Sequence, residues 1–386
     1  MNEPPLNISD DDRYQRLELI GWWDQQRLRE ARIMVVGAGA LGNEVLKNLA
    51  LVGVGQVTVI DLDRIENSNL SRSVLFRAGD AGQPKATVAA SAIREINPDV
   101  TVTAIHGDVL ADVGLGLVRS MDLVIGCLDN REARLWVNRM CWKTGRPWID
   151  GGIQEINGVA KVFRPPDGAC YECGMTDADY RLIQLRYSCP LLRREDLVQG
   201  RVPTAPTIAA IIAGLQVQEA LKLLHGLSVD EGKAMVFNGV ANRFYKTEFQ
   251  HREDCLSHET WGPVRELPLS HLDRLQDVVE QLAASAMPGH VGQLLLDRDL
   301  VTELHCAACN QGQPVMRPRC SVTAGDSVCP QCAGLMVPQM QHVIDVDSPL
   351  AELPLVRLGV PDQEILHLTD GGNPVFVQLS PSPPDH

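Results

Sequence analysis

The sequence predicts an α/β fold in which a doubly wound, mostly parallel sheet carries helices on both faces and is followed by a smaller domain. Three observations support this prediction. Short apolar runs alternate with helix-length segments through the first half of the chain, which is typical of parallel strands joined by helices. The length of 386 residues exceeds what one hydrophobic core usually holds. The composition also changes near Trp261, and a separate group of cysteines follows.

Each element follows from a local pattern. Strands are expected where Val, Ile and Leu form short runs between polar residues or glycines, at Ile33–Val36, Val57–Ile60, Val100–Ile105, Leu123–Gly126 and Trp148–Ile149. Helices are expected where apolar residues recur at helical spacing, at Ala40–Leu51, Lys85–Ile96, Glu132–Thr144 and Ala205–Leu224. The second of these helices ends at Asn97-Pro98, because a residue before proline disfavours the helical conformation.

The same patterns suggest how the chain is divided. Residues 1–30 interleave apolar and charged residues and are expected to form an N-terminal helical segment, ahead of the main α/β domain over 31–260. A second domain is expected over 261–380, with strands such as Gly292–Leu296 and Pro374–Leu379. The last residues, 381–386, have the composition of a disordered tail.

The composition narrows the classes of partner. Lys and Arg number 35 against 49 Asp and Glu, so the net charge of −14 disfavours nucleic acid as a main partner. Polar residues interrupt the apolar segment Ala205–Leu224, which argues against a membrane span. The chain begins with acidic and polar residues where a signal peptide would be basic and then apolar, so we expect a cytoplasmic protein. Eleven cysteines then favour metal ligands and thiol chemistry over disulfides.

A glycine-rich turn between the first strand and the first helix predicts a phosphate site. Gly37, Gly39 and Gly42 form the pattern Gly-x-Gly-x-x-Gly, which points backbone N–H groups and the helix dipole at a phosphate. Asp61 ends the next strand, where a carboxylate can bind ribose hydroxyls. This pattern alone is also consistent with a dinucleotide-dependent dehydrogenase.

The segment after Asp61 favours a triphosphate over a nicotinamide cofactor. It supplies the amide of Asn69, the guanidinium of Arg72 and the ammonium of Lys85 soon after the ribose carboxylate. A triphosphate requires such donors and cations, whereas a nicotinamide does not. The sequence contains no Walker A motif, so a P-loop fold is disfavoured.

From Arg13–Arg16 to about His258, the motifs agree in order and spacing with one family. The glycine-rich turn and the polar segment after it resemble the adenylation domain of the ubiquitin-activating superfamily, which includes the ThiF and MoeB sulfur-carrier activators and the E1 enzymes. The resemblance implies a Rossmann-like doubly wound sheet of the E1/ThiF/MoeB type. Here that sheet would carry an appended C-terminal domain containing a zinc ribbon.

The resemblance also implies that the nucleotide is ATP. Asp61 would bind the ribose, Asn69 and Arg72 the phosphates, and Lys85 the α-phosphate side. The substrate would be the C-terminal glycine of a small ubiquitin-like protein, which the enzyme would convert to an acyl-adenylate.

Two further residues take implied roles from the same family. Asp129, shortly after the strand Leu123–Gly126, would hold Mg²⁺, and Arg16 matches the arginine finger that reaches the partner subunit's site, so a homodimer is implied. Such cations are physically required, because a carboxylate within about 4 Å of ATP meets repulsion on the order of 4 kcal/mol per charge pair at an effective dielectric of about 20. The carboxylate needs no general base, since an α-carboxyl with a pKa of about 3.5 is already ionised near neutrality.

Two groups of residues have the spacing of zinc ligands. Cys170 and Cys173 pair with Cys255 and His258 into a Cys₃His set, where ThiF and MoeB types carry two CxxC pairs, so the histidine departs from the family pattern. The alternative is an incidental histidine beside a structural cysteine. The second group has the spacing of a zinc ribbon and comprises Cys306, Cys309, Cys329 and Cys332. We therefore expect two structural Zn²⁺ ions per chain.

Cys189 is a candidate thioester cysteine. It lies in a polar segment, about 174–203, where family members place a crossover loop and, in some, the reactive cysteine. Nearby arginines would favour the thiolate form of its side chain. An unreactive cysteine is the alternative interpretation.

The residues and the resemblance together predict an E1-like enzyme that adenylates a ubiquitin-like protein, captures the acyl group on Cys189 and passes it to an E2-like protein. The appended domain is similar to that of E1-like proteins in bacterial ubiquitin-like conjugation operons linked to phage defence. One alternative is a sulfur-carrier adenylyltransferase for thiamine or molybdopterin synthesis. A second alternative, from another class, is a non-catalytic scaffold subunit.

Overall fold

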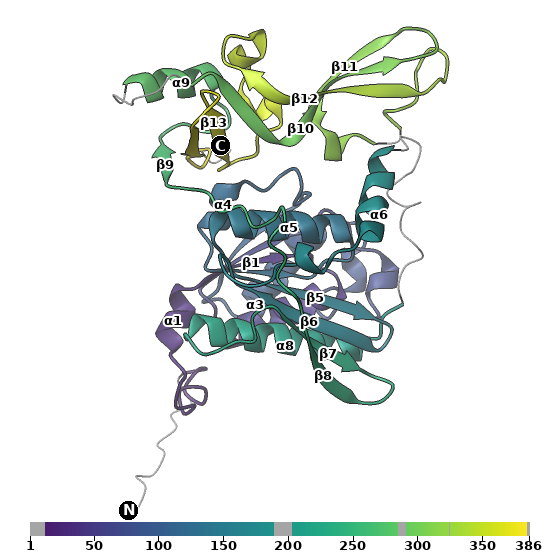
Figure 1. The fold of residues 1–386 in the computed structure, drawn as a ribbon. Helices are drawn as coiled ribbons and strands as arrows, with labels where there is room; N and C mark the ends of the chain where they lie inside the picture. The colour runs from purple at the N-terminus through teal and green to yellow at the C-terminus, as the bar shows by residue number, and fades with distance from the viewer. Residues whose placement is uncertain (1–11, 189–202, 285–290, 324, 384–386) are drawn as a thin grey trace, which may run out of the picture.

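The computed structural model describes residues 12–188, 203–284, 291–323 and 325–383 (Figure 1). Its larger sheet has eight strands in the order β3-β2-β1-β4-β5-β6-β7-β8. The strands are β1 Arg32–Val36, β2 Gln56–Ile60, β3 Thr101–Ile105, β4 Leu123–Gly126, β5 Trp148–Gln154, β6 Asn157–Phe163, β7 Lys233–Asn238 and β8 Arg243–Glu248. The first five strands in this order are mutually parallel, and the last three extend the sheet in antiparallel fashion. The doubly wound parallel sheet is confirmed, and the antiparallel extension adds to it.

Helices cover both faces of this sheet. They are α1 Gln25–Glu30, α2 Ala40–Val52, α3 Lys85–Ile96, α4 Leu115–Arg119, α5 Arg131–Thr144, α6 Asp177–Ser188 and α8 Pro206–Leu224. The helices α2, α3 and α8 pack on one face around a core that includes Val35, Leu46 and Ile212. The helices α4 and α5 cover the other face, where Trp142 and Trp148 are fully buried.

The N-terminal segment differs from the expected helix. Residues 13–22 form successive turns, with hydrogen bonds from Leu17 N to Tyr14 O and from Ile20 N to Leu17 O, and only α1 is helical before β1. Asp24 begins α1, because its side chain accepts hydrogen bonds from the backbone N–H groups of Gln26 and Arg27. Gly21, just before that cap, has a low helix propensity. Within the described residues, the prediction of a helix along this segment is therefore right only for α1.

One helix, α8, has the length and apolar composition of a membrane span among the described residues. It packs against α2, β5 and β6, and its buried residues include Ile208, Ile212 and Gln216. These contacts place α8 in the core between the sheet and a neighbouring helix, as the polar residues in its sequence suggested.

A second sheet follows, with the order β11-β10-β13-β14-β9 and with β12 paired to β10. Its strands are β9 Val264–Leu267, β10 Gln293–Cys306, β11 Gly312–Pro318, β12 Met336–Asp345, β13 Ile365–Thr369 and β14 Pro374–Leu379. The helix α9 Leu275–Ala284 packs on it around a separate apolar core. In Figure 1 this second sheet lies on the side of the larger sheet that carries α4 and α5. The expected strand at Gly292–Leu296 is the start of the much longer β10.

Candidate functional site

The strands β1 and β4 lie side by side at the point where the strand order reverses. From β1 the chain crosses to β2 in one direction, and from β4 it crosses to β5 in the other. At the carboxyl ends of these strands, Cys127 N donates a hydrogen bond to Val36 O at 2.8 Å, and Gly37 N donates to Ile60 O at 2.8 Å. Ligands of doubly wound sheets bind in the crevice at such a reversal, so the glycine-rich turn lies where a nucleotide is expected.

The three glycines of this turn meet different surroundings. Gly37 has a φ of 96°, and a Cβ on it would overlap the carbonyl oxygen of Cys127, which directly follows the neighbouring strand β4. A Cβ on Gly42 would overlap the carbonyl oxygen of Gly37. At Gly39, by contrast, a Cβ would meet nothing within 4 Å, and this residue caps α2 without a side-chain hydrogen bond. The open space in front of Gly39 is where the helix N-terminus can receive a phosphate.

Asp61 is tied to the glycine-rich turn. Its two carboxylate oxygens accept hydrogen bonds from Ala38 N and Asp63 N, each at 2.7 Å. Burial raises the pKa of Asp61, and the charge of Lys85 together with these N–H donors opposes that rise. An ionised carboxylate has about four acceptor positions, so two remain for the hydroxyls of a ribose.

The predicted phosphate-binding residues lie on the segment that joins β2 to α3. Asn69 ends the short 3₁₀ helix η1 Asn67–Asn69, and its side-chain oxygen accepts a hydrogen bond from Glu66 N. Arg72 donates to Ser68 O at 2.8 Å. Lys85 begins α3 and is only 9% exposed, with its ammonium 2.8 Å from the more exposed carboxylate of Asp63. The ammonium of Lys85 is therefore paired with a partner that an anionic ligand could replace.

Asp129 comes two residues after Cys127, whose carbonyl oxygen lies against Gly37 of the glycine-rich turn. Its side chain is exposed and accepts a hydrogen bond from Asn130 at 3.2 Å, and Asn130 in turn caps α5 through Ala133 N. An exposed carboxylate beside a phosphate site is the kind of oxygen ligand that Mg²⁺ accepts in combination with substrate phosphates.

A buried ionic group beneath this loop was not anticipated from the sequence. Asp150 is fully buried and contacts Arg134 at 2.9 Å and Lys161 at 3.2 Å. Arg134 also donates to the carbonyl oxygens of Leu128 and Gly151 and so fixes the backbone immediately before Asp129. The available signal was a carboxylate, Asp150, directly after the apolar pair Trp148–Ile149 of a predicted buried strand.

The N-terminal turns hold Arg16 at the opposite edge of the sheet. Tyr14 is 2% exposed, accepts a hydrogen bond from Asn97 at 2.7 Å, and packs against Gly53, where a Cβ would collide with the tyrosine ring. Gly53 and Asn97 end α2 and α3. Because the 13-residue α2 is about 20 Å long, the exposed Arg16 side chain lies far from the nucleotide crevice of its own chain.

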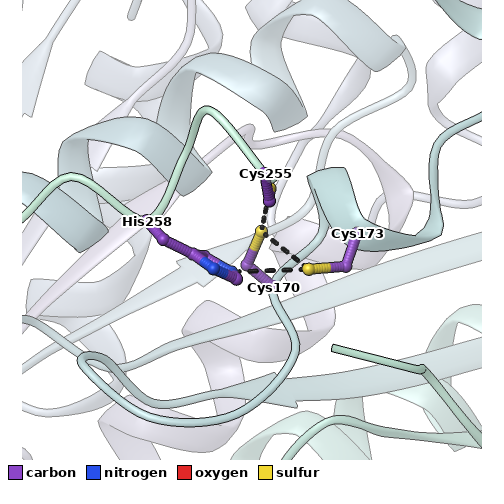
Figure 2. Close-up of side chains that lie close together, drawn as sticks. All are labelled: Cys170, Cys173, Cys255 and His258. Carbon is purple, nitrogen blue, oxygen red and sulfur yellow. Dashed lines mark hydrogen bonds between the residues drawn. The ribbon is translucent and has the colours of Figure 1, made fainter. Parts of the chain in front are cut away.

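The first group of expected metal ligands comes together in space. Figure 2 shows the side chains of Cys170, Cys173, Cys255 and His258 gathered around one point, and all four ligand atoms lie within 4.8 Å of one another. The Sγ atoms of Cys170 and Cys255 are 3.5 Å apart, and Cys173 Sγ is 3.4 Å from His258 Nε2. Zinc with bonds of about 2.3 Å to sulfur and about 2.0 Å to nitrogen requires separations of about 3.5–3.8 Å, so the donor set fits a tetrahedral Zn²⁺.

The surroundings of this site support a closed, structural centre. Burial raises the pKa of Cys170 and of Cys255, and a cation among them would favour their thiolate forms. Burial also lowers the pKa of His258, which keeps the imidazole in the neutral form that binds metals. The buried Glu172 lies between the two cysteines of the first pair and accepts a hydrogen bond from Ser257, which lies between Cys255 and His258, so this contact joins the two ligand pairs.

The second group forms a ribbon in the C-terminal sheet. Cys306 ends β10, and its Sγ is 3.5 Å from that of Cys332, while the Sγ atoms of Cys309 and Cys329 are 3.6 Å apart. The four sulfurs lie within 4.8 Å of one another. The backbone N–H of Cys309 lowers the pKa of Cys306 to about 6, which favours the thiolate that a metal needs. Cys320, between the pairs, is not part of the group.

Cys189 lies outside the described residues. The part of the expected crossover segment that is described contains α6, which docks on α5 through a 2.7 Å ion pair between Arg131 and Asp179. The prediction of a reactive thiol at this position therefore stays a prediction.

The fold and the crevice define a nucleotide-binding α/β protein, and comparison with known proteins identifies its family. Residues 12–257, more than half of the chain, match the model of the ThiF family, and the chain belongs to that family. It is 32% identical over 259 residues to a sulfur carrier protein adenylyltransferase of Thermus thermophilus, covering 63% of this chain and 89% of that protein. It is also 32% identical to a SAMP-activating enzyme E1 of Haloferax volcanii, covering 65% of this chain and 89% of that protein.

Solved structures agree with this fold. A crystal structure of E. coli MccB superposes with a TM-score of 0.54 at 24% identity, covering 65% of this chain and 76% of that chain. The family match ends at residue 257, so the second sheet and its cysteine ribbon lie beyond the part shared with the family model. Adenylyl transfer from ATP is the chemistry expected of a member of this family.

Proposed function

We propose that this protein uses MgATP to adenylate the C-terminal glycine of a ubiquitin-like protein. The observation that supports the proposal most is the crevice between β1 and β4, where an open helix N-terminus at Gly39 lies beside the carboxylate of Asp61. The names of the relatives, sulfur carrier protein adenylyltransferase and SAMP-activating enzyme E1, support a small protein as the substrate.

The roles follow from charge and position. Asp61 accepts hydrogen bonds from the ribose hydroxyls, and the backbone of the glycine-rich turn receives a phosphate. Asn69, Arg72 and Lys85 bind the triphosphate along the β2–α3 segment, with Lys85 exchanging Asp63 for a phosphate oxygen. Asp129 would hold Mg²⁺, which supplies charge neutralisation at the phosphates. The substrate carboxylate then attacks the α-phosphorus, an acyl-adenylate forms and pyrophosphate leaves with the electron pair of the broken P–O bond.

We place Arg16 in the site of a second copy of the chain. Its position at the opposite edge of the sheet supports this assignment, because α2 separates it from its own crevice. Mixing Arg16→Ala and Asp129→Ala proteins tests the idea. Each variant alone should be inactive, whereas a mixed dimer has one site with both residues intact, so about a quarter of the wild-type activity should return after random exchange. If both variants are inactive and mixing restores nothing, Arg16 acts in the site of its own chain, and an Arg16→Ala protein that is fully active alone would place Arg16 outside catalysis.

We propose that the two cysteine-rich groups each bind one structural Zn²⁺. The observed separations between donor atoms match a tetrahedral ion, and four protein ligands leave such an ion no open coordination position for a substrate. The first ion would connect the middle of the main domain to its end, since Cys170 and Cys255 come from segments far apart in the chain.

The conjugation step remains the more specific part of the proposal. In it, the thiolate of Cys189 attacks the acyl carbon, a thioester forms and AMP leaves, after which an E2-like protein accepts the acyl group. The E1 enzymes among the relatives support this order of events, and the sulfur carrier adenylyltransferases support the alternative in which the acyl-adenylate is handed to sulfur. A cytoplasmic location and a role in phage defence remain part of the proposal.

A non-reducing gel separates the candidates. The wild-type enzyme is incubated with MgATP and candidate ubiquitin-like proteins, with and without an E2-like protein. A DTT-sensitive adduct that disappears in Cys189→Ala supports conjugation, and a thiocarboxylate product supports sulfur transfer. If none of the candidates elicits ATP turnover, the scaffold alternative is favoured.

A further inference from the structure

Arg298 joins the second sheet to the nucleotide-binding sheet. It lies in β10, and its side chain is only 7% exposed. Its guanidinium contacts the carboxylate of Glu364, donates to Leu110 O at 2.7 Å and donates to Val113 O at 2.6 Å. The guanidinium carbon also lies 4.8 Å from the centre of the Trp136 ring. One side chain from the C-terminal domain, which lies outside the part of the chain that matches the family model, therefore contacts the main domain at several points.

The backbone carbonyl groups to which Arg298 donates belong to a loop next to the proposed nucleotide crevice. Leu110 and Val113 belong to the loop that leaves β3, beside Asp61: Gly107 N donates to Asp61 O at 3.3 Å, and Asp61 N donates to Ile105 O at 3.2 Å. In a doubly wound sheet the base of a nucleotide extends beyond the ribose carboxylate, away from the reversal between β1 and β4 and toward this loop. The loop thus flanks the adenosine end of the crevice.

The contact between Arg298 and the Trp136 ring is with α5, the helix that follows Asp129. Trp136 lies in α5, whose cap, Asn130, directly follows Asp129. Arg298 therefore contacts both the loop after β3 and the helix after Asp129, the two segments that would flank a nucleotide bound as proposed. No ligand contact by Arg298 itself is needed for this effect.

Glu364 makes the contact between the second sheet and the main domain depend on Arg298. Its other carboxylate oxygen accepts hydrogen bonds from Leu115 N, at the start of α4, and from Ile365 N, both at 2.9 Å. Burial raises the pKa of Glu364, and the charge of Arg298 opposes that rise. The neighbouring backbone is equally close, because Cβ atoms on Gly114 or Gly116 would collide with carbonyl oxygens of residues 362 and 363. A fork of several donors is required to serve all these acceptors at once.

We infer that Arg298 is a positioning residue for ATP binding, through which the C-terminal domain sets the shape of the adenosine side of the crevice. This inference rests on the proposed function, because it assumes that ATP occupies the crevice. It extends that function by making the second sheet part of the nucleotide-binding apparatus rather than only an attached module. Binding of a partner to the second sheet and binding of ATP would then be thermodynamically linked.

The test compares Arg298→Lys with the full-length wild-type protein. Lysine keeps the charge opposite Glu364 but lacks the planar fork that reaches both carbonyl oxygens. We expect the Kd for MgATP, measured by calorimetry, to rise about fivefold or more, a coupling typical of linked sites. Hydrogen exchange should also rise in residues 106–114. Arg274→Lys is the matched control, since Arg274 pairs with Asp277 and Glu352 inside the second domain.

The outcomes separate the inference from the proposed function. If the wild-type protein fails to bind MgATP, the proposed function is wrong. If it binds and Arg298→Lys binds equally well with unchanged exchange in 106–114, the inference is overturned, even if the variant melts at a lower temperature. Should Arg298→Lys fail to fold, Glu364→Gln decides in the same way, because its amide keeps an acceptor for Leu115 N and loses the ion pair.

Discussion

A Cβ atom on Gly42 would occupy the space of the Gly37 carbonyl oxygen, whereas the same atom on Gly39 would meet no neighbour within 4 Å. The two glycines of one turn are therefore required for different reasons. Gly42 allows α2 to approach the end of β1 closely, and Gly39 leaves room for a ligand. This difference gives a matched pair of variants.

Gly42→Ala should lower the stability of the fold, and Gly39→Ala should lower only the affinity for ATP. Overpacking of a tight site costs about 1–3 kcal/mol, so the melting temperature of Gly42→Ala should fall by several degrees. In Gly39→Ala the new methyl group points into the space for a phosphate, so the Kd for MgATP should rise at unchanged melting temperature. Calorimetric titration and thermal unfolding measure both. A Gly39→Ala protein that binds ATP as tightly as the wild type would move the phosphate away from this helix N-terminus.

Arg72→Ala and Asp129→Ala should abolish adenylation while leaving the fold intact. Arg72 makes one backbone hydrogen bond, and Asp129 is exposed, so each change should cost less than about 1 kcal/mol of folding free energy. Losing a charge that stabilises the transferring phosphoryl group costs at least about 100-fold in rate. The assay is substrate-dependent release of AMP. Arg77→Ala is the control, because Arg77 lies on the same segment and its guanidinium donates to the nearby carbonyl oxygens of Val74 and Phe76. Normal turnover in Arg72→Ala or Asp129→Ala would remove that residue from the site.

As the pH falls, ATP binding should weaken at a higher pH than it would if Asp61 had the usual pKa of an aspartate. Burial raises the pKa of Asp61 above its usual value of 3.8, so its carboxylate takes up a proton earlier as the pH falls. The same shift affects the free energy of unfolding in the opposite direction. Between 3.8 and the raised pKa the folded protein holds a proton that the unfolded chain has released, so the contribution of Asp61 to the free energy of unfolding decreases as the pH rises through that window.

The measurement is the Kd for ATP and for 2′,3′-dideoxy-ATP over a series of pH values that descends from neutrality. The two nucleotides have the same phosphates and the same titration, so their difference isolates the contact to the ribose hydroxyls. We expect ATP to bind more tightly near neutrality and its advantage to disappear as Asp61 is protonated. Equal binding of both nucleotides at all pH values would show that Asp61 does not bind the ribose.

The purified protein should contain two zinc ions per chain. Cys255→Ala should lose the ion of the Cys₃His group, and Cys309→Ala that of the ribbon, because three remaining ligands hold zinc much more weakly. Mass spectrometry of metal content checks the number. Cys320→Ala is the control and should keep two ions, since Cys320 belongs to neither group. A zinc content of one or none in the wild-type protein would refute at least one of the two sites.

Much of the parallel sheet could be predicted because its signals are local. The helix Lys85–Ile96 and the strand Leu123–Gly126 have the bounds that their apolar patterns indicate. The two groups of candidate zinc ligands could also be predicted, because the chemistry of zinc fixes the spacing within each pair. Segments whose structure depends on distant contacts were not predictable in the same way. The turns at 13–22 depend on Tyr14 packing against Gly53 and Asn97, a contact that no local pattern reveals.

The interior polar residues show the same limit. In the sequence, Gln216 could be interpreted only as a polar interruption of an apolar helix. In the structure its amide donates to Gly126 O at 2.9 Å and to Ile149 O at 3.2 Å, behind the crevice. The pair of Arg298 and Glu364 joins residues 66 positions apart, and each looks like ordinary surface charge in isolation. Burial and partner choice are properties of the fold, so they emerge only when the sheets are assembled.

In the proposed reaction, the α-phosphate of ATP is joined to the C-terminal carboxylate of a ubiquitin-like protein. Isotope exchange between pyrophosphate and ATP measures that reversible step directly. With a cognate ubiquitin-like protein, exchange should be rapid, should require Mg²⁺, and should vanish when the C-terminal glycine of that protein is deleted. Exchange that proceeds equally well without that glycine, or without any protein substrate, would contradict the account.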